Sequence, residues 1–149
     1  MRKTLIILFP LSLFLMATRC HIAFYETESE ADLTRFAALI YRHGDGYPAA
    51  VLPEIIPILK EFQAERGLSD VEYASAYLVA KLKTGFLNIG ISAALHGDIE
   101  YLYAVYPSGR IDIYTTNFWR GDFTDVDKVE TVNIQTWQPC PECAEEKWL

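Results

Sequence analysis

The sequence predicts a single α+β domain, an antiparallel sheet of about five strands with two helices on one face. Segments that alternate between apolar and other residues, as strands do, lie toward both ends of the chain, and two segments with helical spacing lie between them. The chain has 149 residues, enough for one domain of ordinary size. Its hydrophobic fraction of 51% supplies a core, so disorder is expected only at the ends. The predicted order is strand, strand, helix, helix and three further strands.

The first residues resemble an export signal. Two basic residues precede an apolar run over residues 5–16, which is shorter than the about 20 residues of a membrane-spanning helix. A lipoprotein signal would be cleaved before Cys20, but Arg19 stands where such signals carry a small residue. The competing interpretation starts translation at Met16, so that residues 1–15 are a wrongly included leader. We favour the Met16 start, which predicts a cytoplasmic protein, and keep an exported or lipid-anchored form as the alternative. No transmembrane helix is expected in the mature protein.

The domain is predicted to span residues 16–137, followed by a polar tail over residues 138–149. Alternation over residues 18–25 predicts a first strand, and residues 36–43 a second one. The polar segment between them favours an antiparallel hairpin. A last strand is predicted over residues 129–137, where alternation returns.

Two helices are predicted between the strands. From residue 51 to 66 the apolar residues recur at three-and-four spacing. Since an interior proline costs a helix about 3 kcal/mol, the regular part is expected to begin only near Pro57. Ser69 and Glu72 fit a capping box that starts a second helix, which ends near Lys83. Its predicted core face consists of Tyr73, Ala76, Tyr77, Ala80 and Leu82.

The clearest predicted element is a β-hairpin. Residues 99–106 and 110–114 alternate and are joined by a three-residue turn. That turn length places Val105 opposite Ile111, with the polar residues on the other face. Before the hairpin, the apolar and glycine-interrupted residues 86–95 predict a connector with a short strand.

The charge of the chain argues against nucleic-acid binding. Its 13 Lys and Arg residues are scattered and outnumbered by 20 Asp and Glu residues, which gives a net charge of −7. Proteins that bind a phosphate backbone do so through clustered basic residues. The expected partner is therefore an unknown protein or a small ligand.

Residues 41–48 and 95–101 are the two densest clusters of ionisable, glycine and aromatic residues. The candidates for catalysis in them are His43, Asp45, His96, Asp98 and Glu100. Two imidazoles could share general acid and base roles in phosphodiester cleavage, each oriented by a carboxylate, or the same groups could hold a divalent metal. We favour a structural interpretation, because Asp-Gly is a turn dipeptide and proline starts helices.

The same segments resemble a group of small uncharacterised bacterial and phage proteins. These proteins share a Tyr-Arg/Lys-His-x-Asp-Gly-Tyr-Pro block and a downstream His-Gly-Asp-Ile-Glu-Tyr block, and the similarity covers most of residues 16–137. The position of Gly44 is usually aromatic in that group, so the chain departs there. The resemblance implies no activity. It implies a short cytosolic protein, sometimes carried on mobile DNA, which supports the Met16 start.

The leading hypothesis is a non-enzymatic protein that binds a protein or small ligand through the edge formed by the two clusters. The residues expected to bind are Arg42, His43, Asp45, Tyr47, His96 and Asp98. The rival from another class is a small phosphodiester hydrolase or nuclease that uses His43 and His96. A third possibility is an exported lipoprotein. Polar-tipped aromatics are favoured at interfaces, so Tyr106, Tyr114 and Trp119 are predicted to form an exposed contact surface.

No cofactor is expected, although zinc stays an alternative. Cys140 and Cys143 have the spacing of half a zinc site, which needs two further ligands. Cys20 and His21 are the obvious donors, but successive strand residues point to opposite faces. An inert tail is therefore favoured over a metal site or a redox pair.

Overall fold

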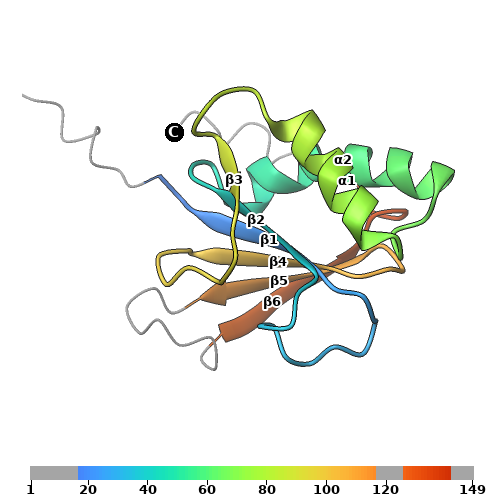
Figure 1. The fold of residues 1–149 in the computed structure, drawn as a ribbon, viewed down its shortest axis with the longest axis horizontal. Helices are drawn as coiled ribbons and strands as arrows, with labels where there is room; N and C mark the ends of the chain where they lie inside the picture. Colours follow the sequence, from blue (N-terminus) through green and yellow to red (C-terminus); the bar gives the residue numbers. More distant parts are fainter. Residues whose placement is uncertain (1–16, 117–125, 142–149) are drawn as a thin grey trace, which may run out of the picture.

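Six strands form one sheet, and two helices cover one of its faces (Figure 1). The computed structural model describes residues 17–116 and 126–141. The elements are β1 (Cys20–Phe24), β2 (Ala38–Arg42), α1 (Pro48–Glu65), α2 (Val71–Leu82), β3 (Ile89–Ile91), β4 (Tyr101–Val105), β5 (Arg110–Thr116) and β6 (Val126–Asn133). The predicted α+β class is confirmed. The short strand expected in the connector after α2 is β3, and it brings the predicted count of about five strands to six.

The strands lie in the order β3-β2-β1-β4-β5-β6, and the sheet is mostly antiparallel. β1 and β2 form the predicted hairpin, in which His21 pairs with Tyr41. β4 lies parallel to β1, because the helices and β3 intervene before the chain returns to the other side of β1. The hairpin of β4 and β5 has the predicted register, with Val105 opposite Ile111.

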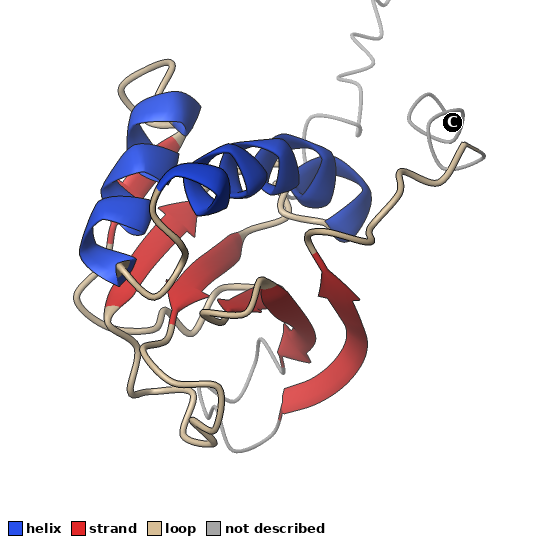
Figure 2. Ribbon diagram, turned by 90° about the vertical axis from the view of Figure 1, so that its right-hand side faces the viewer, coloured by secondary structure: helices blue, strands red, loops and turns tan. Residues whose placement is uncertain are grey.

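The two helices lie over one face of the sheet, called the helix face below (Figure 2). This face holds the larger core. Cys20, Ile22 and Phe24 of β1 belong to it and are at most 1% exposed. Helix α1 adds apolar residues at helical spacing, among them Ile55 and Leu59. Burying one large aliphatic side chain contributes about 1.5–3 kcal/mol, so this face is the main source of hydrophobic stabilisation.

The opposite face, called the loop face below, is covered by loops. Apolar side chains from residues 25–37 and 92–100 pack there against Leu39 of β2 and Leu102 of β4. This second core is smaller. Polar side chains lie beside this core on the loop face, and the candidate site is formed by these side chains.

The predicted aromatic contact surface is wrong for Tyr106, which is 2% exposed. Its ring stacks on that of Tyr25 at 5.3 Å, and the guanidinium of Arg110 lies 4.0 Å from the ring centroid. These contacts bury it in the loop-face core. Tyr114 is partly exposed, and Trp119 lies outside the described residues.

Helix α1 begins earlier than predicted, at Pro48 and not near Pro57. Pro48 occupies the first turn, where no backbone N–H is needed. Pro53 and Pro57 lie on the exposed side of the helix. The carbonyls of Ala49 and Pro53, which lose their helical donors to these two prolines, therefore lie on the side where water replaces the donor.

The predicted capping box of α2 is wrong. The N-cap is Asp70, whose carboxylate makes no cap hydrogen bond; Arg66 donates to its Oδ2 at 2.7 and 3.0 Å. The predicted core face is correct for Leu82 and for Tyr77, which packs against the core, but wrong for Tyr73, Ala76 and Ala80, which are exposed. The helix buries Val71, Ala74, Ser75, Leu78 and Leu82. Neither helix of the described part is long and apolar enough to cross a membrane.

Candidate functional site

The two His-Gly-Asp stretches meet at Tyr41, near the end of β2. The ring of Tyr41 lies 4.5 Å from the ring of His96 and 6.3 Å from the ring of His43, centroid to centroid. Its hydroxyl lies 3.4 Å from Oδ2 of Asp98, a residue 57 positions further along the chain. Two segments far apart in the sequence therefore share one region of the loop face.

His21, which the sequence suggested only as a zinc donor, lies at the centre of this region. Its side chain is buried, and its Nδ1 lies 3.1 Å from the carbonyl oxygen of Ile40. The backbone N–H of His96 donates to its Nε2 at 3.0 Å. A neutral ring with its proton on Nδ1 satisfies both contacts. His21 therefore ties β1 both to β2 and to the loop of His96.

The surroundings of His21 keep its ring neutral. Burial lowers the pKa of His21 to about 4, and the hydrogen bond to Ile40 only partly opposes this effect. The ring of His96 lies edge-on at 4.9 Å and lowers the pKa further. The alternation of β1 is the sequence signal that could have identified His21, because it places this histidine between Cys20 and Ile22, which are both buried in the core.

Asp98 is held by three neighbours. Nη1 of Arg19 donates to Oδ2 at 3.0 Å, beside the Tyr41 hydroxyl, and Nδ1 of His96 lies 3.7 Å from Oδ1. Arg19 reaches this position because the strand pairing of β1 and β4 places it beside Glu100, whose N–H donates to the Arg19 carbonyl. We define the histidine cluster as Arg19, His21, Tyr41, His96 and Asp98.

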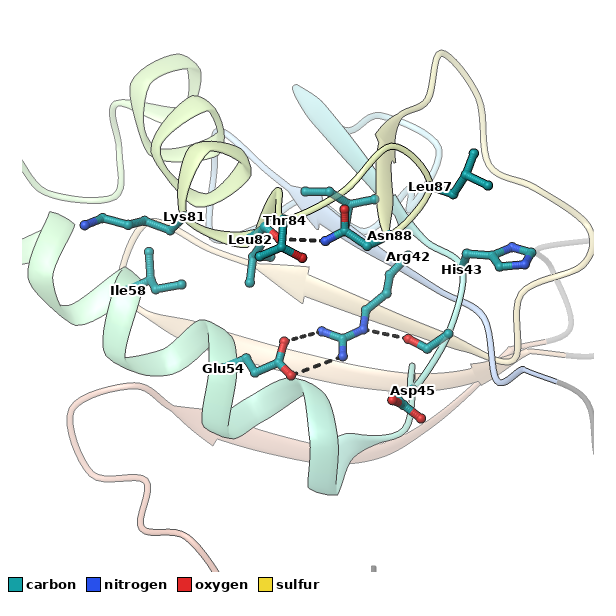
Figure 3. Close-up of a pocket in the computed structure, with 12 residues that line it drawn as sticks. Arg42, His43, Asp45, Glu54, Ile58, Lys81, Leu82, Thr84, Leu87 and Asn88 are labelled. Atoms are coloured by element: carbon teal, nitrogen blue, oxygen red, sulfur yellow. Dashed lines mark hydrogen bonds and ion pairs between the residues drawn. The ribbon is translucent and has the colours of Figure 1, made fainter.

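Arg42 lies on the other side of the sheet from Tyr41, since side chains alternate along a strand. It donates to the carboxylate of Glu54 in α1 at 2.6 and 3.3 Å and to the carbonyl of Gly44 at 2.8 Å (Figure 3). Burial alone would lower the pKa of Arg42, but the bond and charge of Glu54 raise it. The guanidinium therefore stays charged and fixes the turn against α1.

Arg42, His43 and Asp45 line a pocket of about 590 Å³ between α1, the end of α2 and the start of β3. Figure 3 shows His43 and Leu87 at one end of it and Lys81 at the other. His43 also lines a second hollow of about 300 Å³, together with the neighbouring Phe86 and Leu87. Three of the six predicted binding residues thus belong to this pocket, and His96 and Asp98 belong to the histidine cluster.

The turn after Arg42 is fixed by its backbone. Asp45 has a φ of 52°, a conformation that Asp tolerates better than most residues. The N–H of Gly46 donates to the carbonyl of Thr18 at 2.8 Å, and the hydroxyl of Tyr103 donates to the carbonyl of Gly46 at 2.7 Å. A Cβ on Gly46 would lie 2.8 Å from the Thr18 oxygen, so only glycine fits. This geometry agrees with the structural interpretation of the Asp-Gly pair.

Tyr47 and Glu100 lie outside both the pocket and the histidine cluster. The carbonyl of Tyr47 accepts the first N–H groups of α1, and its side chain lines a separate hollow of about 650 Å³ with Trp137 and Cys140. The side chains of Glu100 and Asp45 form no hydrogen bond or ion pair with a histidine in the described part of the chain. The five catalytic candidates therefore do not form one constellation.

The zinc hypothesis stays a prediction. Cys140 is exposed, and Cys143 lies outside the described residues. Cys20 lies on the helix face, where burial raises the pKa of its thiol to about 12, and His21 lies on the loop face. Within residues 17–116 and 126–141, no group of three His, Cys, Asp or Glu side chains is arranged to hold a metal ion.

The fold and the site define this protein as a small α+β domain with a pocket at the end of β2 and a histidine cluster on the opposite face. Comparisons with protein-family models, with curated proteins and with solved structures find no match for the chain.

Proposed function

We propose that this protein binds a partner through a non-catalytic pocket, and that this pocket beside Arg42, His43 and Asp45 receives a small ligand or a side chain of a protein partner. The observation that carries the proposal is the position of Phe86 and Leu87, which are 99% and 84% exposed beside this pocket. Contiguous exposed apolar residues next to a hollow mark binding sites more often than ordinary surface.

The chemistry of the pocket favours a ligand with one apolar and one polar part. Arg42 and Glu54 bind each other, so they form a neutral wall and do not attract an ion of either sign. Leu87 offers apolar surface at one end, and the imidazole of His43 stands beside it (Figure 3). An apolar group of the ligand would cover Leu87, and a polar group would bind His43.

The test is a ligand screen by NMR on the folded chain. Binding should shift backbone signals of residues 42–45 and 84–89, and Leu87→Ser or His43→Ala should weaken the affinity at least tenfold. Val129→Ser is the matched control, because Val129 is an exposed apolar residue, 55% accessible, on β6 at the other edge of the sheet. Ligands that bind Leu87→Ser as tightly as the unchanged protein would contradict the proposal.

A phosphodiester hydrolase or nuclease that uses His43 and His96 is the second candidate. It is supported by the contacts of both imidazole rings with the ring of Tyr41. Hydrolysis of bis(p-nitrophenyl) phosphate that is lost in both His43→Ala and His96→Ala would establish it. Activity that survives either substitution would eliminate the pair.

We also propose a cytoplasmic location with translation from Met16, and the burial of Cys20 supports it. The side chain of Cys20 lies within the helix-face core at 0% exposure, where an acyl chain on its sulfur has no room. Cleavage before Cys20 would also remove Arg19, which binds Asp98. Mass spectrometry of the native N-terminus tests this: an acylated Cys20 would favour the exported lipoprotein.

A further inference from the structure

Ser92 follows β3 and lies next to the histidine cluster. Its Oγ lies 3.1 Å from Nε2 of His96, and Nδ1 of the same ring lies 3.7 Å from Oδ1 of Asp98. A hydroxyl, an imidazole and a carboxylate are thus arranged in the order that activates a serine nucleophile. We propose that Ser92, His96 and Asp98 form an acyl-transfer site, which is separate from the ligand pocket at Arg42.

The ring of His96 is oriented by its neighbours. It stacks on Tyr41 with 28° between the ring planes, and the backbone N–H of His96 is fixed by Nε2 of His21. Asp98 is fixed in turn by Arg19 and by the Tyr41 hydroxyl. His21 and Arg19 are therefore positioning residues, since they hold the base and the carboxylate without touching Ser92.

The position of Asp98 selects the useful tautomer of His96. A carboxylate beside Nδ1 favours the proton on that nitrogen, which leaves the lone pair of Nε2 toward the Ser92 hydroxyl. The 3.7 Å separation is longer than a hydrogen bond. Catalytic hydrogen bonds are often long in free enzymes and tighten when substrate binds.

The surroundings of Ser92 indicate the substrate class. Ser92 lines a hollow of about 450 Å³, and most of the wall is apolar. Phe36, Ala38, Val79 and Ile91 contribute to that wall. The hollow suits a short apolar acyl chain, and the described residues that line it include no Lys or Arg. Small carboxylic esters are therefore the expected substrates.

The reaction balances with water as its only co-reactant. The Ser92 Oγ attacks the ester carbonyl carbon as its proton moves to Nε2 of His96, and the same proton then passes to the departing alkoxide. This releases an alcohol and leaves an acyl group on Ser92. Water, deprotonated by Nε2, then attacks the acyl carbon, and the released Ser92 oxygen recovers the proton. Backbone N–H groups of the residues after the serine, Ala93 and Ala94, are the candidates for stabilising the oxyanion.

The experiment combines p-nitrophenyl butyrate hydrolysis with labelling by a fluorophosphonate, a probe that bonds covalently to activated serines. The unchanged protein should hydrolyse the ester and carry one adduct on the Ser92 peptide. Ser92→Ala should lower the rate at least tenfold and abolish the adduct. Ser69→Ala, which removes an exposed serine far along the chain from any histidine, should change neither.

Further variants separate chemistry from structure. His21→Ala should lower kcat while leaving KM within about twofold, because it removes the acceptor that fixes the backbone of His96 and leaves the acyl hollow intact. His21→Gln should restore kcat, because an amide can keep both hydrogen bonds of His21. Val129→Ser should leave esterase activity unchanged, because Val129 is exposed on β6 and lines neither the acyl hollow nor the ligand pocket. The ester assay does not use the ligand pocket, so failure of the ligand-binding proposal would not affect this one. An equal rate in Ser92→Ala and the unchanged protein, or an adduct on any other serine, would overturn the inference.

Discussion

Cys20 and His21 are neighbours in β1, and they show how differently the two faces of the sheet treat a buried polar group. Both side chains are 0% exposed. Burial raises the pKa of Cys20 to about 12 on the helix face and lowers the pKa of His21 to about 4 on the loop face. Cys20 lies among apolar side chains, whereas both ring nitrogens of His21 have hydrogen-bond partners. Both side chains therefore stay neutral, but only His21, on the loop face, links separate segments of the chain through hydrogen bonds.

The helix face and the loop face differ in the kinds of side chain that cover the sheet. Helices cover their face with regularly spaced apolar side chains, which leaves few positions for polar groups. Loops also bring backbone donors and polar side chains over the sheet, as the backbone of His96 and the side chain of Asp98 do here. We therefore expect the helix face to dominate the free energy of unfolding, and the loop face to dominate its dependence on pH and any catalysis.

The largest expected effect comes from two neighbouring residues of β2. Ile40 is buried on the helix face and Leu39 on the loop face. Ile40→Ala should lower the free energy of unfolding by about 4 kcal/mol and Leu39→Ala by about 2 kcal/mol, because loops relax into a cavity more readily than packed helices do. Urea denaturation of both variants measures the difference. The opposite order would show that the loops pack as rigidly as the helices.

Acid should destabilise the protein through His21. Its pKa is about 4 in the folded state and about 6.5 when unfolded, so the unfolded chain binds the proton first as the pH falls. Stability is therefore intact above pH 6.5 and is lost toward pH 4, by about 3 kcal/mol at most. Urea denaturation at pH 7, 5.5 and 4 measures this loss.

His21→Gln is the matched control for the acid effect. An amide can donate to the Ile40 carbonyl and accept from the N–H of His96, but it does not titrate in this range. The variant should lose less stability than the unchanged protein between pH 7 and pH 4. Parallel pH curves for the two proteins would show that His21 is not the group responsible.

Much of the fold could be predicted from the sequence because its signals are local. Alternation located β1 and β2, and the three-residue turn fixed the register that pairs Val105 with Ile111. The start of α1 was missed because the cost of Pro57 depends on whether the lost hydrogen bond faces water, which is a property of the packed helix. Burial of Tyr106 likewise depends on Tyr25, a partner from another strand end.

The candidate site was predictable only in part. The density of ionisable residues identified His96 and Asp98 as candidates. That the two His-Gly-Asp stretches lie close together could be tested only by the three-dimensional structure, in which Tyr41 contacts His96 and Asp98. The strand alternation that sends Tyr41 to one face and Arg42 to the other separates residues the sequence suggested as one group. Arg19 and Ser92 were missed because neither stands out in composition, and their contacts with Asp98 and His96 arise only from the tertiary fold.

The turn that carries Arg42 toward α1 offers a smaller and sharper test. A Cβ on Gly46 would lie 2.8 Å from the Thr18 oxygen and 2.9 Å from the Cβ of Cys20, whereas a Cβ on Gly44 meets nothing closer than 4.0 Å. Gly46→Ala should therefore cost about 1–3 kcal/mol, as overpacking does. Gly44→Ala should change stability by less than about 0.5 kcal/mol. Thermal unfolding measures both, and equal losses would contradict the close approach of the turn to β1.

The smallest expected effect compares one ion pair from each face. The side chain of Arg42 is 11% exposed and that of Glu54 is 50% exposed, while Arg19 and Asp98 are 34% and 40% exposed. Double-mutant cycles should give a coupling energy of about 1–2 kcal/mol for Arg42 and Glu54, because two hydrogen bonds join them and Arg42 is largely shielded from water. The coupling of Arg19 and Asp98 should stay below about 1 kcal/mol.

Salt distinguishes the two pairs further. At 1 M salt, charges in contact with water are screened over about 3 Å, so the coupling of Arg19 and Asp98 should nearly vanish. The coupling of Arg42 and Glu54 should keep more than half of its value, because screening is weaker where solvent is excluded. If both couplings fell to the same extent, the guanidinium of Arg42 would be as accessible to ions as that of Arg19. The wall of the ligand pocket would then be open to solvent and could attract a charged ligand, which changes the class of molecule that the binding screen should contain.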